Sequence, residues 1–165
     1  MSVTDNSPYR RTREAILEGT KSLIEIRGLR ATTMIDIADN SEVSRATLYN
    51  HFRDKESVLR ALLESEVDRL CGVLTDQSLE QLSIEISCDR ALATLRNVDP
   101  EVVTHLLRSE SDPLWHQIGQ ALLGALGNPV RAQLAARWLI GQVFAPLTPS
   151  QSHEQALAIV ASSQS

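Results

Sequence analysis

The sequence predicts an all-α protein of about nine helices, and three of its features support this prediction. Aromatic residues make up only 4% of the chain, and the apolar residues are mainly Ala and Leu, which lose little entropy in a helix. In the N-terminal half, apolar residues recur at helical spacing. In the C-terminal half, three pairs each place an Asx capping residue before a proline suited to a first helical position: Asp99-Pro100, Asp112-Pro113 and Asn128-Pro129.

The first segments are a predicted tail and two helices. Residues 1–9 are expected to be a flexible tail, because they are small, polar and without a periodic pattern. A first helix is expected from about residue 10 to 27, and Gly28 suits the left-handed position that follows a helix. Thr33, with Asp36 three residues later, can cap a short second helix.

The next start signal is sharper. Ser44 suits an N-cap, and Val43 and Leu48 occupy the two positions of a hydrophobic staple. A connection of about three residues, 41–43, therefore joins two short helices, which is the layout of a helix-turn-helix unit. Asp54 is expected to cap a long fourth helix with an apolar stripe.

The remaining chain, residues 57–165, is expected to form a C-terminal helical domain. Helices are predicted at about 100–108, 113–126, 129–145 and 152–163. The stretch 76–97 alternates polar and apolar residues in part, but a lone strand has nothing to pair with. We therefore predict that it is helical, with a break near residues 87–89.

Composition and charge restrict the possible functions. Residues 1–62 hold ten Lys/Arg against nine Asp/Glu, whereas the rest of the chain holds six against twelve, for a net charge of −5. The near-neutral first part and the acidic remainder suggest two roles. No apolar run suits a membrane span, and the polar N-terminus has no signal-peptide pattern, so a cytoplasmic protein is expected. We find no catalytic set, no metal-ligand spacing at the two cysteines and no cofactor motif, so an enzyme is not expected.

The third helix carries the chemistry. At 100° per residue, Leu48 and Phe52 share one side of it, where they can dock the helix on its neighbours. Small and hydrogen-bonding groups then face outward, as a helix entering the major groove of DNA requires. The residues that could read bases are Arg45, Ala46, Thr47 and Asn50. Those that suit phosphate contacts are Tyr49, His51 and Lys55.

The stretch GLRATTMIDIADNSEVSRATLYNHFRDKESVLRALL resembles the N-terminal domain of the TetR family of transcriptional regulators. Its strongest part is Leu48-Tyr49-x-His51-Phe52-x-x-Lys55-Glu56-x-x-Leu59, and the resemblance covers about residues 10–65. It implies a three-helix helix-turn-helix DNA-binding domain at 10–56, a homodimer and a palindromic double-stranded DNA operator. It also implies C-terminal helices that form the dimer interface and a ligand pocket. By the resemblance, Thr33 joins Tyr49, His51 and Lys55 as a phosphate-contacting residue.

The chain departs from the family pattern at three points. The family usually has Gly in the turn where this sequence has Glu42, which lacks the backbone freedom of glycine and adds negative charge near DNA. Ile35 stands where a polar residue is commoner. The C-terminal part is shorter than in most members, which leaves room for a small effector pocket or for none.

Two further groups of residues are assigned with an alternative beside each. Candidate contacts for a small apolar effector are His105, Trp115, Ile118 and Leu122, of which the last three share a helical face and could instead be ordinary core. Candidate dimer contacts are Ala135, Trp138, Leu139 and Gln142, which could equally pack within one chain. The expected function is a DNA-binding regulator, most simply a repressor. The first alternative is a TetR-like protein that has lost DNA binding and acts through protein–protein contacts, and the second is a ligand-independent regulator with a closed core. A third is a helical enzyme, which only a pocket with perturbed titrating groups would support.

Overall fold

The computed structural model describes residues 7–75, 78–107 and 113–161, and it is helical without strands across those residues. The ten helices are α1 (Pro8–Arg27), α2 (Met34–Asn40), α3 (Arg45–His51), α4 (Lys55–Gly72), α5 (Leu79–Cys88), α6 (Arg90–Val98), α7 (Pro100–Leu107), α8 (Pro113–Leu126), α9 (Pro129–Phe144) and α10 (Pro149–Ala161). The predicted all-α fold is therefore confirmed. Within the described ranges, no helix is both long and apolar enough to cross a bilayer.

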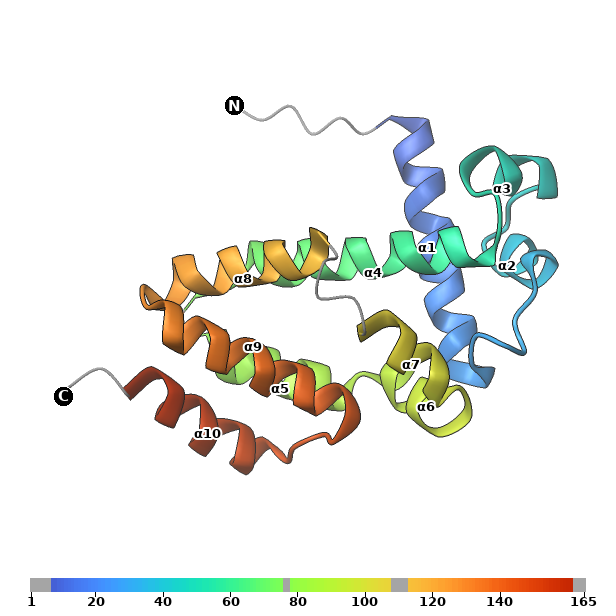
Figure 1. Ribbon diagram of the computed structural model, residues 1–165. Helices are drawn as coiled ribbons and strands as arrows, with labels where there is room; N and C mark the ends of the chain where they lie inside the picture. Colours follow the sequence, from blue (N-terminus) through green and yellow to red (C-terminus); the bar gives the residue numbers. More distant parts are fainter. Residues whose placement is uncertain (1–6, 76–77, 108–112, 162–165) are drawn as a thin grey trace.

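The helices form two groups that share α4 (Figure 1). α1, α2 and α3 gather at one end of the molecule, and α4 runs lengthwise away from them beside α8. α5, α9 and α10 pack together at the other end, and α6 lies against α1 with α7 beside it. One buried cluster joins α1–α4 to α6 and α7, and a second is formed mainly by α5, α8, α9 and α10. The N-terminal helices thus share a core with part of the C-terminal region.

Most helix starts are set by the capping residues that the sequence indicates. Thr33 and Asp36 form a capping box at α2, and the side chain of Asp54 accepts the Ser57 N–H at 2.8 Å at the start of α4. Asn128 caps α9 by accepting two backbone N–H groups. α1 begins at Pro8, because Ser7 caps it by accepting the Arg10 N–H at 3.3 Å. Pro8 and Tyr9 of the predicted tail therefore belong to α1, and residues 1–6 lie outside the described residues.

Three other expectations are corrected by the structure or concern residues outside the described ranges. The predicted break at residues 87–89 separates two helices, α5 and α6, because the Asp89 side chain accepts the Leu92 N–H at 2.8 Å and caps α6. This gives ten helices where about nine were expected. Asp99 does not cap its own helix, since its Oδ2 atom accepts the N–H groups of Leu29 at 2.6 Å and Arg30 at 3.1 Å in the α1–α2 loop. Asp112 lies outside the described residues.

The crossing of α1 and α2 depends on a glycine. A Cβ atom built on Gly19 would lie 2.3 Å from the Oγ of Ser41 and 3.3 Å from its Cα. Beside this contact, the Asn40 side chain donates to the Gly19 carbonyl at 2.9 Å. The close approach fixes the end of α2, and with it the turn into α3, against α1.

We predict that Gly19→Ala lowers the free energy of unfolding by about 1 kcal/mol, because overpacking outweighs the gain in helix propensity. Adding Ser41→Ala should recover part of this loss, since the Ser41 Oγ is the atom that clashes and is itself buried without a hydrogen-bond partner among the described residues. Gly124→Ala in α8 is the matched control, because nothing lies within 4 Å of its Cβ position, and it should raise stability. Chemical denaturation measures all three. If Gly19→Ala raised the free energy of unfolding as much as Gly124→Ala, α2 could move away from α1 at little cost.

Candidate nucleic-acid interface and adjoining pocket

The third helix is held by its apolar side and exposes the opposite one. Leu48 is fully buried and Phe52 is 5% exposed, as the predicted docking requires. A helix of seven residues is not stable alone in water, so these two side chains hold it in place. Arg45, Ala46 and Asn50 are exposed on its outer side. The first turn of α3 therefore presents small and hydrogen-bonding groups to solvent on a fixed backbone.

Thr47 and Tyr49 differ in how freely they can reach a partner. The Thr47 side chain is half-buried, and its hydroxyl lies 2.8 Å from the Oγ of Ser44, the N-cap of α3. A base contact by Thr47 would compete with this cap. The Tyr49 side chain is 56% exposed, and it can reach a phosphate without breaking a contact of α3.

Thr33 lies at the start of α2 and is tied to an acidic neighbour. Its hydroxyl donates to Asp36 at 2.7 Å, and its backbone N–H donates to the same carboxylate at 2.8 Å. These two hydrogen bonds, with Arg27 adding a contact at 3.0 Å, lower the pKa of Asp36 to about 2. A phosphate approaching Thr33 would thus meet an ionised carboxylate, partly neutralised by Arg27.

His51 contacts the start of the chain. Its ring stacks on that of Tyr9, with centroids 4.2 Å apart, and Arg13 lies 5.6 Å from the centroid of the adjacent Phe52 ring. Burial, and secondly the charge of Arg13, lower the pKa of His51 below its ordinary value. A neutral, stacked imidazole positions α1 against α3 rather than supplying a positive charge to DNA.

Lys55 has a structural role that the sequence did not reveal. Its ammonium group donates to the carbonyl oxygens of Leu29 and Thr32, each at 2.8 Å, and approaches that of Arg30 at 3.4 Å. The α1–α2 loop is thereby anchored to the first turn of α4. A phosphate contact by Lys55 would draw the ammonium group away from these carbonyls.

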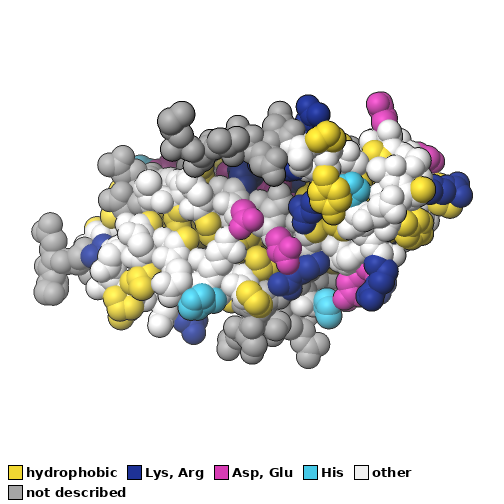
Figure 2. Space-filling model, turned by 90° about the horizontal axis from the view of Figure 1, so that it is seen from above, with side chains coloured by type: hydrophobic (Ala, Val, Ile, Leu, Met, Phe, Trp, Pro, Cys, Tyr) yellow, Lys and Arg dark blue, Asp and Glu magenta, His cyan; other side chains and the backbone are white. Residues whose placement is uncertain are grey.

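Positive side chains gather near the same end of the molecule. Arg10, Arg11, Arg45 and Arg53 are all exposed on α1, on α3 or just after α3. On the face that Figure 2 presents, Lys and Arg side chains are found mainly over the half that holds α1–α3. The local charge of this end therefore differs from the net charge of −5 for the whole chain.

An internal pocket adjoins this end. It has a volume of about 250 Å³ and is lined by side chains of α1 and of α4 to α9. Three of the predicted effector contacts, Trp115, Ile118 and Leu122, lie in its wall. The fourth, His105, is exposed and does not line it.

The predicted dimer contacts on α9 lie on its inner side. Ala135 is fully buried, and Gln142 is 2% exposed and accepts hydrogen bonds from Ser83 at 2.7 Å and Ser87 at 3.0 Å. Leu139 lines the pocket, and Trp138 donates to Gln155 of α10 at 2.6 Å. The outer side of α9 instead exposes three large apolar side chains: Val130, Leu134 and Phe144.

Known proteins that are similar in sequence include regulators with a helix-turn-helix domain. Residues 16–62 match the family model described as "Bacterial regulatory proteins, tetR family". The HTH-type transcriptional repressor KstR2 of Mycolicibacterium smegmatis is 36% identical over 69 residues, which are 42% of this chain and 33% of that protein. The HTH-type regulator YfiR of Bacillus subtilis is 30% identical over 118 residues, 72% of this chain and 53% of that one.

The N-terminal domain belongs to the tetR family. The aligned part spans about a third of the length of the KstR2 repressors. A crystal structure of NalD, the secondary repressor of the MexAB-OprM multidrug efflux pump in Pseudomonas aeruginosa, has a similar fold, with a TM-score of 0.50 and 16% identity over 93% of this chain and 96% of that one. The names of these relatives are of transcriptional regulators, in agreement with the expectation that the chain is not an enzyme.

Tyr9 is a contact of the TetR domain that the sequence analysis missed. Ser7-Pro8 has the same pattern of a capping residue and a following proline that marks helices in the C-terminal half, and this pattern places Tyr9 on α1 rather than in a tail. Its stacking on His51, 42 positions away in the chain, has no local signal.

The departure of Glu42 from the TetR pattern has a structural cost. Glu42 has φ 55°, and it is the one non-glycine residue with positive φ among the described residues. A left-handed conformation costs a residue with a Cβ about 1–2 kcal/mol. Glycine avoids this cost but loses more conformational entropy on folding, so its net advantage at this position is smaller. The turn therefore keeps the geometry that glycine suits.

We predict that Glu42→Gly raises the free energy of unfolding by about 0.5–1 kcal/mol. It should also raise DNA affinity, because a carboxylate next to the DNA-facing side is removed. Glu42→Gln is the matched control: it removes the charge but keeps the Cβ, so it should raise affinity without raising stability. Thermal unfolding and DNA titration separate the two effects. If Glu42→Gln stabilised the fold as much as Glu42→Gly, charge rather than backbone strain would be the cause.

We also predict that Lys55→Met lowers the free energy of unfolding by about 1–2 kcal/mol, the loss expected when hydrogen bonds to a charged group are removed. Arg53→Met is the control, since the Arg53 side chain is 91% exposed and should change stability by less than about 0.5 kcal/mol. Denaturant titration without DNA measures both. Equal stability of the two variants would mean that the carbonyl contacts of Lys55 contribute nothing to the fold.

Proposed function

We propose that the chain is a sequence-specific DNA-binding transcriptional regulator, acting as a repressor. The observation that carries the proposal is the exposed side of α3, with Arg45, Ala46, Tyr49 and Asn50 outward and Leu48 and Phe52 buried, inside a TetR-family domain. In this proposal Asn50 and Arg45 read base edges, because an amide pairs well with adenine and a guanidinium with guanine. A repressor is favoured because the KstR2 relatives and the NalD structure are of repressors. The proposed location is the cytoplasm, where such a DNA partner is reached.

A homodimer on a palindromic operator is part of the proposal. Two recognition helices must then meet major grooves about 34–36 Å apart, or a multiple of this distance. The predicted contacts on the inner side of α9 are used within the chain, so we assign the interface to its outer side. There Val130 is 64% exposed, and Leu134 and Phe144 are each 51% exposed. Apolar side chains of this size on one helix are typical of a surface that another chain covers.

Control by a small apolar effector is also proposed, and the pocket supports it over a ligand-independent regulator. α4 links the two sites, since its first residue, Lys55, holds the α1–α2 loop while Leu63 and Leu70 line the pocket further along the same helix. A second link is Asp99, at the junction of α6 and α7, which binds the same loop. An occupant that favours another placement of α4 or α6 would change DNA affinity by its differential affinity for the two states.

A helical protein with weak or lost DNA binding, acting through protein–protein contacts, is the second candidate. Glu42 favours it, because it places an exposed carboxylate in the helix-turn-helix turn. The ionised Asp36 beside Thr33 adds a second negative charge near a proposed phosphate contact. The two candidates differ in whether the exposed side of α3 selects a DNA sequence.

The test is a salt titration of binding to fragments of the source genome, including the DNA upstream of the gene for this protein. Selective binding of one fragment, with affinity falling steeply as salt rises, is expected for a sequence-reading regulator that neutralises phosphates. Uniformly weak binding to all fragments at low salt would reject the proposal in favour of the second candidate.

On the selected fragment, we predict different behaviour for two exposed residues of α3. Asn50→Ala should relax the preference at one base position by about 1–3 kcal/mol. Tyr49→Phe should weaken binding to all sequences alike, because a phosphate contact carries no base information. Binding to a set of singly substituted operators measures both. If both variants lost affinity uniformly, Asn50 would not be a base-reading residue.

A further inference from the structure

The pocket wall is almost wholly apolar except at one place. Most of its lining residues are aliphatic, contributed by Leu, Ile, Val and Ala side chains of several helices. A cavity of about 150 Å³ lined by such groups takes up benzene, so the volume of about 250 Å³ found here suits an apolar body of on the order of ten non-hydrogen atoms. The volume and the apolar lining thus indicate the size and character of the apolar part of a ligand, but they do not indicate its polar group.

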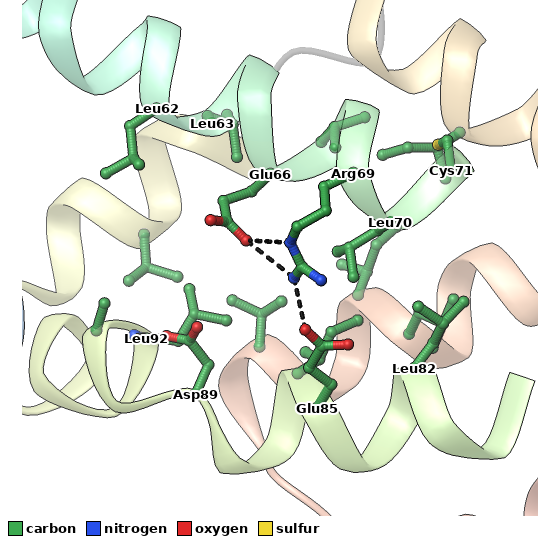
Figure 3. Close-up of a pocket in the computed structure, with 18 of the residues that line it drawn as sticks. Leu62, Leu63, Glu66, Arg69, Leu70, Cys71, Leu82, Glu85, Asp89 and Leu92 are labelled. Carbon is green, nitrogen blue, oxygen red and sulfur yellow. Dashed lines mark hydrogen bonds and ion pairs between the residues drawn. The ribbon is translucent and has the colours of Figure 1, made fainter. Parts of the chain in front are cut away.

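Five charged side chains line the pocket, and ion pairs join them across α1, α4 and α5 with the start of α6. They are Lys21, Glu66, Arg69, Glu85 and Asp89. Four of them, Glu66, Arg69, Glu85 and Asp89, are labelled in Figure 3. The five side chains are between 22% and 48% exposed, so they lie where the cavity meets solvent. The cluster holds three carboxylates against two positive groups, and the mouth of the pocket therefore has an excess negative charge.

Each positive group in this cluster is shared by two carboxylates. Lys21 lies 3.2 Å from Glu66 and 3.3 Å from Asp89. Arg69 lies 3.0 Å from Glu66 and 2.5 Å from Glu85. Burial opposes the charge on Lys21, yet the carboxylates of Asp89 and Glu66 outweigh it and raise the pKa of Lys21 above its ordinary value. These carboxylates thus stabilise the positive charge that Lys21 already carries.

This arrangement discriminates between ligand head groups. An anionic head would have to displace a carboxylate from Lys21 or Arg69, and each displaced carboxylate would lose its partner. A cationic head that binds Glu85 competes with Arg69, but Arg69 keeps its contact with Glu66, so no positive group is left without a carboxylate. An uncharged head neither gains nor loses this interaction.

We propose that the pocket takes a lipophilic cation, with an apolar body of about ten non-hydrogen atoms in the cavity and an ammonium-type head among Glu66, Glu85 and Asp89. This inference rests on the effector control in the proposed function and names the class of effector.

The same contacts connect the ligand head to the DNA-facing end. Arg69 on α4 is bound to Glu85 on α5, so this ion pair links the two helices. A ligand cation that binds Glu85 competes with Arg69 and loosens this link. α4 would then be freer to move relative to α5, and its first turn holds the α1–α2 loop through Lys55.

The test compares three probes that share an eight-carbon tail: octylammonium, 1-octanol and octanoate. Isothermal titration of the full-length chain at neutral pH gives their affinities. We expect octylammonium to bind most tightly and octanoate most weakly. Octanoate binding as tightly as octylammonium, or equal affinities for all three probes, would overturn the proposal.

Two variants with opposite expected effects exclude a merely structural role of the cluster. Glu85→Gln should weaken octylammonium binding about fivefold, the scale of one partly exposed ion pair, and should leave 1-octanol unchanged. Arg69→Gln should strengthen octylammonium binding, because it frees Glu66 and Glu85. Glu80→Gln on the same helix is the matched control, since Glu80 pairs with His153 outside the pocket. A loss of affinity in both Glu85→Gln and Arg69→Gln would contradict the proposal.

DNA titration of the unliganded chain separates this inference from the proposed function. Tight octylammonium binding by a chain that binds no DNA fragment would support the ligand class and reject the regulator. Selective DNA binding with no preference for octylammonium would support the regulator and reject the ligand class.

Discussion

The buried carboxylate of Asp99 joins the α1–α2 loop to the junction of α6 and α7. It is 3% exposed, and it accepts the N–H groups of Leu29 and Arg30 from the α1–α2 loop. A buried charge without partners is strongly destabilising, so the loop and the α6–α7 junction must keep this geometry. Gly28 makes the approach possible, because a Cβ there would lie 2.6 Å from the Asp99 carboxylate. Lys55 binds carbonyl groups of the same loop. Side chains from outside the loop therefore bind both N–H and carbonyl groups of its backbone.

This loop is the point on which the placement of α2 and α3 depends. α2 starts directly after it, and α3 contacts the rest of the molecule through Leu48 and Phe52 in the cluster shared by α1–α4, α6 and α7. Because α6 packs against α1 within that cluster, a shift of α6 would be felt at the exposed side of α3. The pocket is lined by α1 and α6 but not by α2 or α3. In the proposed effector control, an occupant would therefore act on the exposed side of α3 through the shared cluster, since the two sites use different residues.

The features that could be predicted from the sequence are those with a local signal. Helix starts at Thr33, Ser44, Asp54 and Asn128 follow from a side chain that binds a backbone group two or three residues later, and the docking side of α3 follows from helical spacing. The contacts of Asp99 with Leu29 span 70 residues and carry no such signal. Helical spacing also could not show whether Gln142 contacts a second chain or its own chain. A dimer interface and an intrachain core both favour apolar and small residues around such a position. The structure resolves this through the hydrogen bonds of Gln142 with α5.

The net charge of the whole chain is a poor guide to its partner, because the length of α4 separates charges at its far end from the α1–α3 end. α4 has 18 residues, so at 1.5 Å per residue it is about 27 Å long. Exposed charges at its far end are separated from the α1–α3 end by more than the screening length of about 8 Å at physiological salt. In the proposed function, DNA affinity would therefore depend mainly on the few charges near α3. Four exposed cations lie there: Arg10, Arg11, Arg45 and Arg53. Two of them are paired, Arg10 with Glu14 and Arg53 with Asp54, and Glu42 adds an exposed carboxylate in the turn. On this argument, the carboxylate of Glu42 in the turn would influence DNA binding more than the distant acidic residues of the chain.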